Sequence, residues 1–251
     1  MTTLLKLGGS AITRKEEPET VDEEALETAA ADIGNARDAD EVEDFVLVHG
    51  AGSFGHYRAA QHDLSRTDGT HDAAAITEVH NSMTALTEIV VGTLQEYGIE
   101  AVPVRPLSLA HRHEDGTLGL PSEGIEAMLA EEFVPVLHGD VIVNAGKGGT
   151  ILSGDEIIVP LARSLSADRV GLCSTVPGVL DDDGEVVPEI HTYDEVAGVL
   201  GESAATDVTG GMAGKVRALL DLAVPAHIFD PSGLAAFLDG DSPGTVIRSR
   251  D

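Results

Sequence analysis

Short apolar runs alternate with longer segments of helical periodicity along this chain, and that alternation constrains its fold more than any other feature. Apolar runs of strand length occur at residues 4–7, 45–48, 101–104, 134–137, 141–143, 169–174, 226–229 and 245–247. Helical spacing of apolar residues occurs at residues 21–37, 71–97, 122–132, 155–165, 193–200 and 212–222. A strand that returns through a helix to another strand pairs with it in parallel. The pattern therefore predicts a layered α/β fold with a mostly parallel sheet.

The length of 251 residues fits one α/β domain or two lobes that share a sheet. No repeat or linker interrupts the chain, so we expect a single domain over residues 1–251. A soft boundary near Ala167 separates residues 1–166 from residues 167–251. With 42% hydrophobic but only 3% aromatic residues and no Trp, the core must consist mainly of Ala, Val, Leu and Ile.

Acidic residues dominate the charge, with 44 Asp plus Glu against 15 Lys plus Arg and a formal net charge of −29. Such a chain lacks the clustered cations that bind nucleic acid, and an acidic membrane surface repels it. The acid is spread along the sequence, which is typical of a solvated coat in a high-salt cytoplasm, where ions screen the repulsion. An ordinary acidic protein is the alternative.

The single cysteine, Cys173, cannot form an internal disulfide and lies in an apolar run, so we expect it to be buried in a strand. We see no signal peptide, and no apolar run reaches the roughly 18 residues that a membrane span needs. These features indicate a cytoplasmic protein.

Only four lysines remain in this acidic background, and three of them lie in or beside glycine-rich segments. The four are Lys6, Lys15, Lys147 and Lys215. Lysine beside exposed backbone N–H groups is a common arrangement for holding phosphate. Chance under an acidic bias is the alternative, above all for Lys147.

A glycine turn follows the apolar run at residues 45–48, and Gly50, Gly52 and Gly55 match the G-x-G-x-x-G dinucleotide fingerprint. That fingerprint requires a second strand soon afterwards, ending in an acidic residue. Here a loop and a long helix follow instead, which argues against a dinucleotide-binding oxidoreductase. There is no G-x-x-x-x-G-K-[ST] P-loop either, so phosphate binding must come from dispersed segments.

Those dispersed segments resemble the amino acid kinase superfamily. They are Lys6-Leu7-Gly8-Gly9-Ser10, the His49-to-His56 turn, Ser153-Gly154-Asp155 and Asp207-to-Lys215. The His-Gly-Ala-Gly-Ser-Phe-Gly-His ending at His56, together with His138-Gly139-Asp140, is similar to the isopentenyl phosphate kinases of archaea. The resemblance covers essentially the whole chain. It implies a three-layer αβα sandwich with a phosphate-acceptor lobe at residues 1–166 and a nucleotide lobe at residues 167–251.

The resemblance further implies phosphoryl transfer from ATP, with Mg²⁺, to isopentenyl phosphate, in a homodimer. The catalytic residues it implies are Lys6, Lys15, His56, Asp155 and Lys215. The residues it implies for ATP binding are Lys6, Leu7, Gly8, Gly9, Ser10, Gly52, Ser174, Gly211 and Lys215. For the acceptor it implies Ala51, Gly52, His56 and Gly139, and it implies no protein ligand to a metal. His56 is expected to bind the acceptor phosphate and not to act as a base.

Several alternatives stay open at this point. A sibling kinase could act on another phosphate monoester, such as an aminomethylfuran phosphate or a nucleoside monophosphate, and a non-catalytic nucleotide sensor is a third class. Asp155 could simply cap its helix. Thr175 stands where the family usually carries Asp, which weakens the inference for the segment around Ser174. The apolar stripe could wall a prenyl pocket or only fill the core; it comprises Ile76, Val79, Met83 and Leu86.

Overall fold

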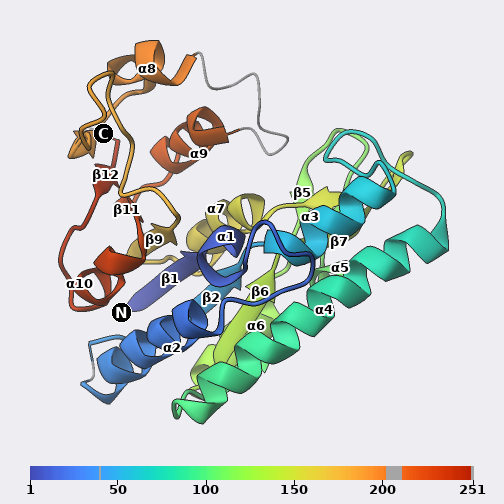
Figure 1. The fold of residues 1–251 in the computed structure, drawn as a ribbon, viewed down its shortest axis with the longest axis horizontal. Helices are drawn as coiled ribbons and strands as arrows, with labels where there is room; N and C mark the ends of the chain where they lie inside the picture. Colours follow the sequence, from blue (N-terminus) through green and yellow to red (C-terminus); the bar gives the residue numbers. More distant parts are fainter. Residues whose placement is uncertain (40, 202–210, 250–251) are drawn as a thin grey trace.

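One large sheet crosses the computed structural model, which describes residues 1–39, 41–201 and 211–249 (Figure 1). Among the described residues it has eight strands, in the order β10-β12-β11-β9-β1-β2-β6-β3. All neighbouring strands are parallel except β11 and β12. The bounds are β1 Thr2–Leu7, β2 Asp44–His49, β3 Ala101–Pro103, β6 Val134–His138, β9 Arg169–Cys173, β10 Glu189–Ile190, β11 Ala226–Phe229 and β12 Thr245–Ile247. The mostly parallel sheet is confirmed.

Helices cover both faces of this sheet, because alternate strand residues point to opposite sides. Leu4 packs in one buried cluster and Leu5 in the other. The first face carries α6 (Glu123–Ala130), α7 (Gly154–Ser164) and α9 (Gly211–Leu220). The second face carries α2 (Glu23–Asp38), α4 (Ala73–Glu96) and α10 (Leu234–Leu238). The molecule is therefore the three-layer αβα sandwich that the sequence led us to expect.

The sequence pattern did not reveal a second, smaller sheet. Its strands, in the order β5-β4-β7-β8, are Leu118–Gly119, His111–Arg112, Asp140–Asn144 and Gly148–Leu152. The run at residues 141–143, expected as a strand, lies in this sheet and not in the large one. Segment 179–187 turns back on itself, with an isolated antiparallel bridge between Leu180 and Val186.

The expectation of a loop after His56 was wrong. The chain forms α3 from Gly52 to Gln61 and only then a loop, before α4 begins at Ala73. Smaller helical segments are α1 (Gly9–Ile12), α5 (Pro106–Leu109), α8 (Ala197–Gly201) and the 3₁₀ turns η1 (Tyr193–Glu195) and η3 (Pro231–Gly233). No helix in the described ranges has the length and apolarity to span a membrane.

The expectation for Cys173 is confirmed. It ends β9 with 2% of its surface exposed, and burial raises the pKa of its thiol to about 12. The large sheet runs through the proposed boundary near Ala167, because β1 pairs with β9. The division into two lobes at that point stays a prediction.

The carboxyl ends of four parallel strands meet at one edge of the sheet, and the turns that leave them are tied together. In each case the first residue after a strand donates its N–H to the last residue of a neighbouring strand, at 2.8 to 3.0 Å: Ser174 to Phe229, Gly8 to Cys173, Gly50 to Leu7 and Gly139 to His49. The sheet ladder thus continues one residue into each turn. These hydrogen bonds hold the turns in place at the carboxyl edge of the parallel sheet, where a ligand is expected to bind.

Candidate active site

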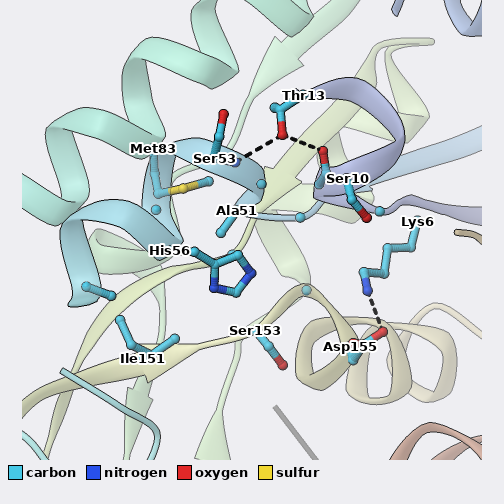
Figure 2. Close-up of a pocket in the computed structure, with 18 of the residues that line it drawn as sticks. Lys6, Ser10, Thr13, Ala51, Ser53, His56, Met83, Ile151, Ser153 and Asp155 are labelled. Atoms are coloured by element: carbon cyan, nitrogen blue, oxygen red, sulfur yellow. Dashed lines mark hydrogen bonds and ion pairs between the residues drawn. The ribbon is translucent and has the colours of Figure 1, made fainter. Parts of the chain in front are cut away.

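A pocket of about 860 Å³ opens at this carboxyl edge (Figure 2). Most of the site residues predicted from the sequence line it: Lys6, Gly8, Gly9, Ser10, Lys15, Ala51, Gly52, His56, Gly139, Asp155, Ser174 and Lys215. Two are not among its lining residues. The side chain of Leu7 is buried in the core, and Gly211 is buried in the first turn of α9. Segment 207–210 of the last motif lies outside the described residues.

Two lysines from distant parts of the chain share one carboxylate in this pocket. Lys6 Nζ lies 2.5 Å from Asp155 Oδ1, and Lys215 Nζ lies 3.9 Å from Asp155 Oδ2. All three side chains are largely buried, with exposed fractions of 11% for Lys6, 19% for Asp155 and 22% for Lys215. Strand β1, helix α7 and helix α9 bring them together. The arrangement concentrates positive charge while Asp155 limits the repulsion between the two ammonium groups.

Asp155 is not the cap of its helix. Ser153 occupies that position and accepts a hydrogen bond from the N–H of Glu156, whose carboxylate accepts from the Ser153 N–H in return. This reciprocal pair is a capping box, which satisfies the start of α7 without Asp155. The carboxylate of Asp155 is therefore available for the lysines, and the capping alternative is wrong.

The two glycine turns pack backbone against backbone at the mouth of the pocket. A Cβ on Gly9 would collide with the backbone N of Gly52. Gly52 itself has φ of +50°, and a Cβ there would collide with the side chain of Thr13. Thr13 Oγ1 donates to the Gly9 carbonyl at 2.8 Å and accepts the Ser53 N–H at 3.0 Å. The N–H groups at the starts of α1 and α3, which lack intrahelical partners, are thereby held close together.

His56 projects from α3 into the pocket. In Figure 2 its ring points into the space between the Lys6–Asp155 pair and Ile151. Helix α3 can approach α4 closely because Gly55 faces Met83, whose Sδ would collide with any Cβ at that position. His56 therefore lies on the side of the pocket that α3 and α4 form together.

The end of the pocket near α4 is apolar. It is lined by Ala59, Leu64, Val79, Met83 and Ile151. Of the apolar stripe predicted on this helix, Val79 and Met83 face the pocket. Ile76 packs beside the small cluster around Val79, and Leu86 lies in the main core. Half of the stripe therefore walls the pocket and the other half fills the core.

A buried histidine cluster lies behind the turn at Gly139. The rings of His49 and His138 stack with their centroids 5.6 Å apart, and burial lowers the pKa of His49 to about 3. Asp140, whose side chain is fully buried, binds His80 Nδ1 at 2.9 Å and accepts the N–H of Leu107 at 3.1 Å. These contacts fix the turn that carries Gly139.

The sequence pattern missed one cation of the pocket. Arg66 lines it, and its Nη2 lies 2.9 Å from Glu156 Oε1. The same carboxylate oxygen lies 2.7 Å from Arg112 Nη2. Arg66 lies in the loop after α3 without a glycine motif beside it, so no local signal marked it. Thr175, where the family usually has Asp, lines the pocket, whereas Lys147 is exposed outside it and donates to the Thr67 carbonyl at 3.3 Å.

Comparisons with known proteins agree with this fold. The family model described as "Amino acid kinase family" matches residues 1–230. The isopentenyl phosphate kinase of Haloferax volcanii is 56% identical over 98% of both chains, and that of Methanocaldococcus jannaschii is 34% identical over 98% of both. A solved structure described as "X-ray structures of isopentenyl phosphate kinase" superposes with a TM-score of 0.82 at 30% identity, covering 98% of this chain and 100% of that one. The chain belongs to the amino acid kinase family and, within it, to the isopentenyl phosphate kinases.

Proposed function

We propose that this enzyme transfers the γ-phosphoryl group of ATP to isopentenyl phosphate, producing isopentenyl diphosphate and ADP. The observation that carries the proposal is a single pocket with a cationic end at Lys6 and Lys215, an apolar end beside α4, and His56 projecting into it. Such a pocket matches an acceptor with a phosphate head and a short hydrocarbon tail. The 56% identity to an isopentenyl phosphate kinase supports the same acceptor.

In the proposed reaction an oxygen of the acceptor phosphate attacks the γ-phosphorus. The bond from that phosphorus to the oxygen bridging it to the β-phosphate breaks, and ADP leaves. The attacking oxygen is already anionic, so no general base is required, and His56 serves to donate a hydrogen bond to the acceptor phosphate. Backbone N–H groups of Ala51 and Gly52, with the turn at Gly139, complete the acceptor site.

Charge stabilisation is the main catalytic task, because the transition state spreads negative charge over the moving phosphoryl group. We assign this task to Lys6 and Lys215, which Asp155 orients, and to Lys15 at the open side of the pocket. The amides of Gly9, Ser10 and Gly52 hold the ATP phosphates. Gly8 and Ser174 line the same site, but their N–H groups already donate to the Cys173 and Phe229 carbonyls. Leu7 and Gly211 do not line the pocket, so we assign them no direct contact with ATP.

The residues present do not fit a magnesium site held by the protein. Within the described part of the chain, no three His, Cys, Asp or Glu side chains converge to hold a metal ion. Asp155 is engaged by two lysines. We propose that Mg²⁺ enters with ATP on the phosphate oxygens.

Three further parts of the proposal concern the molecule as a whole. Residues 1–166 form the acceptor lobe and residues 167–251 the nucleotide lobe. The enzyme works in the cytoplasm.

The enzyme acts as a homodimer. Candidate residues for the contact between its two copies are the exposed apolar side chains Ile89, Tyr97 and Phe133. Light scattering coupled to gel filtration tests the last point.

A kinase acting on another phosphate monoester is the second candidate. The pocket wall near α4 is mostly aliphatic, whereas a nucleobase requires hydrogen-bonding partners. A coupled ADP-release assay at high KCl with a panel of phosphate monoesters separates the two. We expect turnover of isopentenyl phosphate, and a His56→Ala variant should raise the KM for the acceptor by about tenfold or more while leaving the KM for ATP unchanged.

The matched control is His71→Ala, an exposed histidine outside the pocket, which should behave like the wild type. Turnover of another monoester without turnover of isopentenyl phosphate would refute the acceptor assignment. Full activity of the His56→Ala variant would remove the role proposed for His56.

A further inference from the structure

Lys15 is presented to the pocket by a short surface segment, residues 13–21, which we call the Lys15 segment. Its base is closed by an isolated bridge between Thr13 and Val21 and by a hydrogen bond from the Arg14 N–H to the Thr20 carbonyl at 3.0 Å. Its tip is exposed, and Lys15, Glu16 and Pro18 line the pocket from there. In the part of the chain that the structure describes, Lys15 forms no ion pair, unlike Lys6 and Lys215. Its position therefore depends on what holds the segment.

Glu19 anchors the far side of this segment. Its two carboxylate oxygens bind Arg58 in a two-pronged pair, Nε to Oε1 at 2.9 Å and Nη2 to Oε2 at 2.9 Å. Ser82 of α4, which is buried, donates to Oε1 at 2.9 Å. The hydrogen bond from Arg58 holds the pKa of Glu19 below its ordinary value, so the carboxylate stays ionised.

The backbone at Glu19 is in a conformation that a residue with a side chain rarely adopts. Its φ is +51°, in the left-handed region, which costs a non-glycine residue about 1 kcal/mol or more. Such a conformation persists only where the surroundings determine it. Here those surroundings are Arg58 and Ser82, together with the Glu19 N–H donating to the Ser53 carbonyl at 3.2 Å.

The anchor connects the Lys15 segment to the helix that carries His56. Arg58 follows His56 by two residues on α3, and Ser53 lies in the first turn of the same helix. The Thr20 N–H donates to Ser53 Oγ at 3.2 Å, and Ser53 Oγ donates to the Thr20 carbonyl at 3.2 Å. The segment and α3 are therefore joined at two separate points, around Ser53 and around Glu19.

We propose that Glu19 is a positioning residue, which together with Arg58 and Ser82 holds the Lys15 segment against α3 and so sets Lys15 relative to His56 around the acceptor phosphate. This inference rests on the proposed function. If the ion pair were purely structural, the expected result would differ. Both side chains are 32% exposed, and a partly exposed pair contributes only about 0–1 kcal/mol to stability and does not act through Lys15.

The first test of the anchor needs no substrate. Arg14 and Lys15 are trypsin sites within the segment, so mass spectrometry can follow the rate of cleavage there. We expect Glu19→Ala to be cleaved about tenfold faster than the wild type, with a melting temperature close to the wild-type value. The control is Glu88→Ala, which breaks an exposed pair with Arg105 at 3.5 Å away from the segment. It should leave cleavage unchanged.

The second test is a double-mutant cycle between Glu19→Ala and Lys15→Ala. Kinetics are measured with whichever phosphate monoester the wild type turns over, so that a wrong acceptor assignment does not decide the outcome. We expect Glu19→Ala to lower kcat by about tenfold in the wild type and to have almost no effect in the Lys15→Ala background. Ser82→Ala, which removes one hydrogen bond, should show a smaller effect of the same kind and serves if Glu19→Ala folds poorly.

Two results would overturn the inference. One is an unchanged rate of cleavage in both anchor variants, because the segment would then not depend on Glu19. The other is a loss of kcat that is equally large with and without Lys15, because Glu19 would then act by another route.

Discussion

At the scale of single residues, the four lysines of this chain have different surroundings. Lys6 and Lys215 meet at Asp155, Lys15 lines the pocket from an exposed segment, and Lys147 lies outside the pocket. The glycine-rich neighbourhoods of Lys6, Lys147 and Lys215 look alike in the sequence. Only the fold separates them, because it brings the ends of β1 and the starts of α7 and α9 to one place.

The shared carboxylate makes a direct prediction. Asp155→Asn keeps the shape of the side chain but removes the charge that orients Lys6 and Lys215. We expect kcat to fall by about a hundredfold with a small change in the KM for ATP, because in the proposed mechanism the lysines act chiefly on the transition state. Steady-state kinetics measure this, with the exposed Asp182→Asn as a control of equal charge change. Equal activity of the Asp155→Asn variant and the wild type would contradict the role of Asp155.

Two buried histidines predict a dependence of stability on pH. Burial lowers the pKa of His49 to about 3 and that of His227 to about 4. The unfolded rings titrate near 6.5, so below about pH 6.5 the unfolded chain binds protons that the folded chain does not. Each ring should therefore reduce the free energy of unfolding by about 1.4 kcal/mol per pH unit as the pH falls from 6.5 toward its folded pKa.

Urea unfolding at about pH 7 and about pH 5 measures this loss. A His227→Phe variant keeps a flat ring beside Phe237 and should lose less stability over that interval than the wild type. The exposed His71→Asn variant should match the wild type. The same loss in the His227→Phe variant as in the wild type would show that this ring does not titrate on unfolding.

At the scale of elements, periodicity predicted the long helices and the strands of the large sheet well. Residues such as Leu4 and Leu5 alternate between two apolar layers, and this leaves a clear signal in the sequence. The small sheet left only the apolar run at residues 141–143, because β4 and β5 have two residues each and β4 pairs with β7, which is distant in the sequence. Helix α3 was missed because its glycines lower helix propensity, while packing of Gly55 on Met83 stabilises the helix in the fold.

The close packing of the glycine turns predicts opposite effects for two glycine substitutions. Gly52→Ala places a methyl group onto Thr13 at a φ of +50°, so it should lower both stability and activity. Gly92→Ala on α4 meets nothing within 4 Å and should raise the free energy of unfolding by about 0.5–1 kcal/mol. Thermal unfolding of the two variants measures both effects. A Gly52→Ala variant as stable and active as the wild type would contradict the packing at this turn.

At the scale of the whole molecule, the resemblance to a family located most of the pocket, since residues from every motif converge there. It could not locate Arg66, nor the anchor formed by Glu19, Arg58 and Ser82. These side chains carry no motif, and their contacts join α3 and α4 to a surface segment through the folded shape. Pairings of this kind depend on which side chains meet across the fold, and no local pattern in a single sequence marks such contacts.

The formal charge of −29 predicts strong salt dependence. Repulsion between carboxylates is screened over about 10 Å at 0.1 M salt and about 3 Å at 1 M, so added KCl should stabilise the folded state. We expect the melting temperature to rise steadily up to about 2 M KCl. Tetramethylammonium chloride at equal ionic strength should produce most of the same rise, because screening does not depend on the cation. A flat or falling melting temperature would contradict the screened acidic coat.

The proposed function requires that the enzyme make a diphosphate from a prenyl monophosphate. Phosphorus NMR of the enzyme with ATP and isopentenyl phosphate tests it most directly, because it identifies the product and not only the release of ADP. We expect the monophosphate signal to disappear while two coupled diphosphate signals grow in step with ADP. An unchanged monophosphate signal, in enzyme that converts a different monoester under the same conditions, would contradict it.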